Sequence, residues 1–69
     1  MPLFNQVSQV YAPKELDIMR QCFSRAAIML EESGRNYEES ELATTVLRLY
    51  DRGMRDVDGL SELAARLSA

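Results

Sequence analysis

The stretch PKELDIMRQCFSRAAIMLEESG, residues 13–34, decides the fold of this chain. Its proline suits the first position of a helix, where the missing N–H has no intrahelical partner to lose. The acidic residues that follow, Glu15 and Asp17, lie where the positive end of the helix dipole favours them. Gly34 is typical of the residue that ends a helix. The stretch therefore predicts one helix over residues 13–33.

Two apolar lines run along this predicted helix. The first advances by steps of three and four residues through Leu16, Met19, Phe23, Ala26 and Leu30. The second lies beside it and comprises Ile18, Cys22 and Met29. Together they cover about half of the helix circumference, which is wider than the ~100° stripe of a simple surface helix. We therefore expect this helix to contact other elements on two sides, or to contact the bundle on one side and a second chain on the other.

Two shorter helices are predicted after Gly34, over residues 39–52 and 58–68, with Gly53 between them. The expected inward stripes are Leu42, Val46 and Leu49 in the first, and Leu60, Leu63, Ala64 and Leu67 in the second. Asp58 is expected to cap the start of the last helix. The predicted fold is all-α, a three-helix bundle in which the long helix packs against an αα-hairpin.

Residues 1–12 are predicted to form an N-terminal arm that precedes a three-helix domain over residues 13–69. The apolar residues of the arm recur at helical spacing but include residue types that favour strands, so a short helix and an extended segment are both compatible with it. We expect these apolar side chains to dock on the bundle or on a neighbouring subunit.

The composition restricts both the source of stability and the kind of function. The chain has 69 residues, one Cys and no His, which excludes a disulfide framework and the usual zinc ligand sets. A domain of this size has marginal stability, so regular helix packing or a partner must supply what disulfides and metals do not. The net charge of −3 disfavours a protein whose main task is to neutralise nucleic acid phosphates.

The same composition predicts a location. The chain contains no apolar run of the ~20 residues that a membrane span needs. Its start lacks the basic and apolar regions of a secretory signal. A single cysteine within a helical pattern suits a reducing compartment. We therefore expect a cytoplasmic protein with no membrane partner.

Catalytic and metal-binding chemistry is not indicated. Without His there is no imidazole base, and the only thiol, Cys22, lies on the apolar side of its helix, where a buried thiol with a raised pKa is expected. The segment Asp56–Gly59 is similar to the middle of a calcium loop, but Met54 and Ala65 stand where that loop needs acidic ligands. We predict no catalytic, cofactor or metal site.

Two surfaces remain as candidates for binding. Arg48, Arg52 and Arg55 form a possible docking surface for a protein partner, since guanidinium groups suit bidentate contacts with carboxylates. The alternative is a solvated face in which Asp51 pairs with Arg55. The surplus apolar surface predicts a homodimer interface comprising Ile18, Cys22, Met29, Phe4, Val7 and Tyr11.

The sequence therefore predicts a small non-enzymatic protein–protein interaction module, a homodimer with a regulatory or adaptor role. The alternative is a helix-turn-helix DNA-binding regulator built from the second and third helices. Its recognition helix would expose Ser61, Glu62, Ala65, Arg66 and Ser68. A third alternative is a small-molecule carrier that uses a methionine-lined space between helices, although such a pocket is large for this chain.

Overall fold

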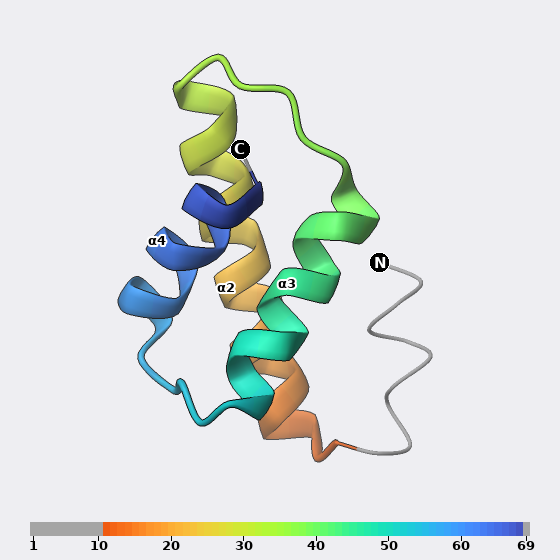
Figure 1. Cartoon of the computed structure of the whole chain (residues 1–69). Helices are drawn as coiled ribbons and strands as arrows, with labels where there is room; N and C mark the ends of the chain where they lie inside the picture. Colours follow the sequence, from red (N-terminus) through yellow and green to blue (C-terminus); the bar gives the residue numbers. More distant parts are fainter. Residues whose placement is uncertain (1–10, 69) are drawn as a thin grey trace.

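The computed structural model describes residues 11–68, which form three α-helices and no strand (Figure 1). These are α2 (Pro13–Glu32), α3 (Glu39–Asp51) and α4 (Val57–Ser68). Each helix packs against the other two. The prediction of an all-α three-helix bundle is confirmed, and the helix bounds differ from the predicted ones by one residue at one end of each helix.

The longest helix, α2, is the spine on which α3 and α4 pack as a hairpin (Figure 1). Gly34 and Gly53 end α2 and α3 with φ angles of 70° and 105°, in the left-handed region that favours glycine. The N–H of Gly34 donates to the Glu31 carbonyl at 3.1 Å, and the next N–H donates to the Leu30 carbonyl at 3.0 Å. Gly53 repeats this arrangement after α3. Both helices therefore end in the glycine motif that the sequence predicts.

The core is built from side chains of all three helices. Its buried apolar members are Leu16, Met19, Cys22, Ala26, Ala27 and Leu30 from α2, Leu42, Ala43, Val46, Leu49 and Tyr50 from α3, and Leu60, Ala64 and Ala65 from α4. Ser61 of α4 is also fully buried. The buried face of α4 thus consists mainly of small side chains, and small side chains at a contact allow helix axes to approach closely.

This small-residue face corrects the predicted orientation of α4. Ser61 and Ala65 were expected at the surface and are buried, whereas Leu67 was expected in the stripe and is 61% exposed. The face that fits closely against the bundle is the one with the smallest side chains, and this geometric requirement outweighs the larger apolar area of leucine. In α2, Phe23 is half-buried against the core and does not lie at its centre.

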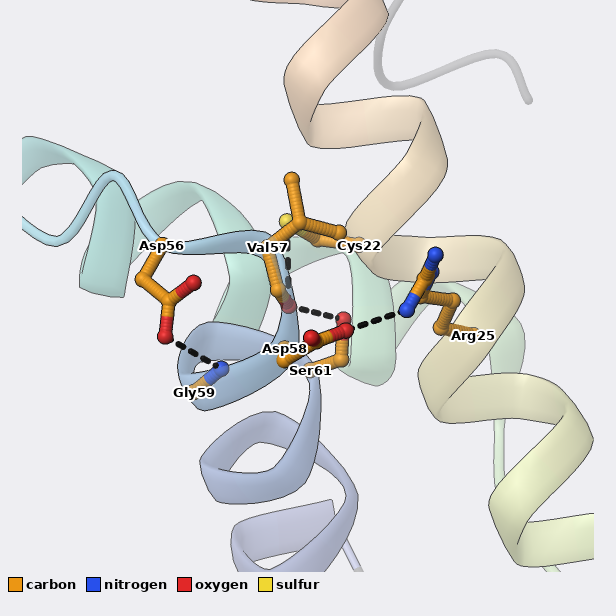
Figure 2. Close-up of polar contacts among 7 residues, drawn as sticks. All are labelled: Cys22, Arg25, Asp56, Val57, Asp58, Gly59 and Ser61. Carbon is orange, nitrogen blue, oxygen red and sulfur yellow. Dashed lines mark hydrogen bonds and ion pairs between the residues drawn. The ribbon is translucent and has the colours of Figure 1, made fainter.

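The start of α4 differs from the prediction in a second way (Figure 2). Asp56, not Asp58, caps the helix, because its carboxylate Oδ2 accepts the N–H of Gly59 at 3.1 Å. The Asp58 carboxylate instead pairs with Arg25 of α2. Since α4 begins at Val57, the capping position is residue 56, two residues before the predicted cap.

Substitution of Met19 tests the assigned core, because no part of the Met19 side chain is exposed. Met19→Ala should destabilise the fold by about 2–5 kcal/mol through lost burial and a residual cavity. Ile28→Ala is the matched control on the same helix, since Ile28 is 54% exposed, and it should change stability by no more than about 0.5 kcal/mol. Urea unfolding followed by circular dichroism measures both. Equal effects would contradict the assigned core.

The capping assignment predicts different effects for two neighbouring aspartates. Asp56→Ala should cost about 1 kcal/mol, because it leaves a donor at the start of α4 without its side-chain acceptor. Asp58→Ala removes only an ion pair whose two side chains are more than half exposed, and should cost less than about 0.5 kcal/mol. Thermal unfolding of the two variants compares them directly. A larger loss at Asp58 would restore the cap predicted from the sequence.

Candidate docking surface

An open groove runs between α3 and the C-terminal end of α4. Its larger part has a volume of about 520 Å³ and is lined by Ser40, Glu41, Thr44, Thr45, Arg48, Leu67 and Ser68. A smaller part of about 290 Å³ adds Leu49 and Arg52 and shares Thr45, Arg48 and Leu67 with the first. We call the two parts together the α3–α4 groove.

The helical period of α3 places one stripe of side chains along this groove. Glu41, Thr45, Arg48 and Arg52 follow one another at steps of four, three and four residues. At 100° per residue, these positions fall within about 60° of one another and on a different side from the buried Leu42, Val46 and Leu49. Packing of the inner face of α3 therefore holds this stripe outward.

Arg48 and Arg52 present the free basic groups of the groove. Among residues 11–68, no hydrogen bond or ion pair engages the guanidinium group of either side chain. The hydroxyl groups of Thr44 and Thr45 donate to the carbonyls of Ser40 and Glu41 at 2.8 and 2.9 Å. These hydroxyl oxygens keep lone pairs for an incoming donor. The groove thus offers positive charge, hydroxyl acceptors and an apolar contact.

Arg55, the third member of the predicted arginine surface, is used inside the fold. Its Nη1 donates to the carbonyl of Tyr50 and, at 3.2 Å, to that of Met54. Its guanidinium carbon lies 3.7 Å from the centre of the Tyr50 ring, a cation–π contact. The alternative interpretation, in which Arg55 pairs with Asp51, is not found among the described residues, where the Asp51 carboxylate accepts the Tyr11 hydroxyl. The arginine surface therefore reduces to Arg48 and Arg52.

Tyr11 and Tyr50 form an aromatic contact where the start of α2 meets the end of α3. Their rings lie edge to face, with centres 6.2 Å apart. The Tyr50 hydroxyl donates to Glu15 Oε2 at 3.2 Å, while Glu15 Oε1 accepts the N–H of Ala12 at 3.0 Å. The hydrogen bond to Asp51 raises the pKa of Tyr11, and burial followed by the bond to Glu15 raises the pKa of Tyr50. This contact ties Tyr11 to its own chain.

The other predicted dimer-interface residues lie in different environments. Ile18 and Met29 are half-buried and pack against the core of their own chain. Cys22 has no exposed surface, so it cannot contact a second chain, and its burial corrects that prediction. Phe4 and Val7 lie outside the described residues. The predicted interface on α2 is therefore smaller than the sequence suggested.

The surroundings of Cys22 explain its chemistry (Figure 2). Its Sγ lies 3.9 Å from the Val57 carbonyl oxygen, which also accepts the Ser61 hydroxyl at 2.5 Å. Burial raises the pKa of the Cys22 thiol, while the hydrogen bond with Ser61 and the charge of Arg25 act in the opposite direction. A buried, protonated thiol is a poor nucleophile, so Cys22 serves as a small core residue.

Three further findings concern other kinds of site. Within residues 11–68, no three acidic or thiol side chains come together as a possible metal site. Met19 fills the core, and no methionine lines the α3–α4 groove. None of the helices in this part of the chain combines the length and the apolar character of a membrane span.

Comparison of the chain with protein-family models, curated proteins and solved structures found no match. The described residues form a small all-α bundle, and basic, hydroxyl and apolar side chains meet in its α3–α4 groove.

The tyrosines predict a pH dependence at alkaline pH. The pKa values of Tyr11, Tyr37 and Tyr50 are all raised in the folded chain, so the folded state holds the phenolic protons more tightly than the unfolded state does. The resulting stabilisation is present below the ordinary tyrosine pKa of about 10 and is lost as pH rises through the higher folded values. Tyrosinate absorbance should therefore appear at higher pH in the native chain than in the urea-unfolded chain. Coincident titration curves would contradict these contacts.

Proposed function

We propose that this protein is a small non-enzymatic interaction module of the cytoplasm, a homodimer with a regulatory or adaptor role, which binds protein through the α3–α4 groove. The observation that carries this proposal is the position of Arg48 and Arg52 beside Leu67. Both guanidinium groups lack a partner within the described residues, and Leu67 is 61% exposed next to them. Such a site is suited to a surface that combines carboxylates with an apolar side chain.

Physical considerations support protein as the ligand class. Arginine is enriched at protein interfaces because its planar group makes bidentate contacts with carboxylates at a modest desolvation cost. Exposed leucine beside it supplies apolar area that is removed from water on binding. The chain as a whole carries a net charge of −3, so the arginine pair is a local feature and not part of a general basic surface.

A helix-turn-helix role is the alternative, because α3, residues 52–56 and α4 form a helical hairpin. In that role α4 would enter the major groove of DNA. Its exposed side chains include the acids Asp58 and Glu62 and the single base Arg66. Carboxylates repel phosphates, and Ser61, which was expected to reach DNA, is buried. These observations favour protein over DNA as the partner.

The proposal is tested by affinity capture from the native cells with three baits, each with and without nuclease. The wild-type chain should retain protein in stoichiometric, nuclease-resistant amounts. The Arg48→Glu, Arg52→Glu double variant should lose at least about 90% of it, since reversal of two interface charges costs more than the ~1.4 kcal/mol of a tenfold change in affinity. Arg35→Glu, an exposed arginine outside the groove, is the charge-matched control and should retain it.

The other outcomes are equally distinct. Equal retention by all three baits would place the binding surface elsewhere and contradict the proposal. Retained nucleic acid that disappears after nuclease treatment would favour the helix-turn-helix alternative. Circular dichroism establishes that each variant is folded before capture.

A further inference from the structure

We propose that the occupant of the α3–α4 groove is the same groove of a second copy of this chain. In this arrangement the two α3 helices run antiparallel about a two-fold axis that passes between Thr44 and Thr45. The inference rests on the proposed function, namely that the groove binds protein, and it identifies the partner and its orientation. It also moves the dimer interface away from α2, where the sequence placed it.

The order of charges along α3 carries the argument. Glu41 and Arg48 lie on one stripe of α3, and both line the larger part of the groove. They are seven residues apart, about 10 Å along the helix axis, which is too far for an ion pair within one chain. Among residues 11–68, no side chain forms an ion pair with either of them. Each charge therefore lacks an opposite partner within the part of the chain that the structure describes.

A two-fold axis supplies those partners. In an isologous contact the same patch meets itself, so residue i faces j and residue j faces i. The midpoint between positions 41 and 48 falls between Thr44 and Thr45, whose side chains line the same part of the groove. Antiparallel helices that cross there place Glu41 of each copy opposite Arg48 of the other. Parallel helices would place Glu41 beside Glu41 and Arg48 beside Arg48, which repel.

The charges at the two ends of α3 fit the same two-fold axis. Arg52 lies at the C-terminal end of the stripe, while Glu38 and Glu39 flank the N-terminal end. About the same axis, position 52 falls opposite position 37 of the other copy, the residue next to Glu38. Antiparallel packing also brings the positive end of each helix dipole beside the negative end of its neighbour. The acidic and basic ends of α3 are thus complementary to each other.

Leu67 supplies the apolar centre of the contact. It lines both parts of the groove together with Thr45 and Arg48, so it lies near the level of the proposed axis. Its side chain is 61% exposed, the higher exposure of the two exposed large apolar side chains among the described residues. In the dimer the two Leu67 side chains would cover each other. Charge pairs at the rim set orientation, and apolar contact at the centre supplies affinity.

The experiment is a charge-complementation test on the full chain by analytical ultracentrifugation. The Glu41→Arg variant presents basic residues at both positions, and the Arg48→Glu variant presents acidic residues at both. Each variant alone should dimerise at least about tenfold more weakly than the wild type, because both symmetric contacts become like-charged. An equimolar mixture should form a heterodimer with nearly wild-type affinity, since both contacts are then opposite in charge.

Matched controls separate this result from general charge effects. Glu32→Arg makes the same change at an exposed position at the end of α2, and Arg35→Glu reverses an exposed arginine outside the groove. Both should dimerise like the wild type. Leu67→Ala should weaken the dimer and leave the circular dichroism spectrum unchanged, since Leu67 is outside the core.

Three outcomes would overturn the inference. These are a wild-type chain that stays monomeric at millimolar concentration, single variants that dimerise like the wild type, and a mixture that does not recover affinity. Affinity capture distinguishes failure of the dimer inference from failure of the proposed function. If the Arg48→Glu, Arg52→Glu bait loses a different protein while the wild type is monomeric, the groove binds protein but not a second copy.

Discussion

The close approach of α4 to α2 is the constraint on which the rest of the structure depends. The buried residues of α4 are Leu60, Ser61, Ala64 and Ala65, and the neighbouring spine contributes Cys22, Ala26 and Ala27. Small side chains on both helices allow a short distance between their axes. The Val57 carbonyl lies within reach of both the Cys22 thiol and the Ser61 hydroxyl, which places the start of α4 directly on α2. A polar residue is tolerated there because its hydroxyl is hydrogen-bonded.

This position of α4 determines what reaches the surface. With Ser61 and Ala65 turned inward, Leu67 lies outside the core and borders α3. α3 contributes four of the larger buried side chains of the core, Leu42, Val46, Leu49 and Tyr50. Because its apolar side chains all point inward, the outer stripe of α3 is left polar and charged. The groove is thus a consequence of how the hairpin packs on the spine.

Arg55 has a different role from Arg48 and Arg52 for a physical reason. Tyr50 at the end of α3 is surrounded by Arg55, Tyr11 and the Glu15 carboxylate, so the charges near it are satisfied within the chain. Arg48 and Arg52 each lie two residues from Tyr50 and project from the opposite side of the helix, away from that aromatic cluster. Proximity to Tyr50 therefore separates a structural arginine from two that are available for binding.

The sequence by itself determined the elements of this protein. Proline and acids at the start of α2, glycines after α2 and α3, and apolar residues at helical spacing each act locally, so three helices and their ends were predictable within one residue. Part of the arginine surface was predictable for the same reason, since Arg48 and Arg52 are one turn apart on a polar face. These features depend only on backbone geometry and helical period.

Only the tertiary structure decided which face of α4 is buried, which aspartate caps it and which arginine is free. The helical pattern of apolar residues placed Leu67 on the buried face of α4. The contact with α2 instead favours small side chains, and this preference depends on the two helices together. Cys22 likewise changed from a candidate interface residue to a core residue because α4 covers it. The role of Arg55 depends on a ring brought near it by packing, and the groove depends on α3 and α4 together, so neither is encoded in a local pattern.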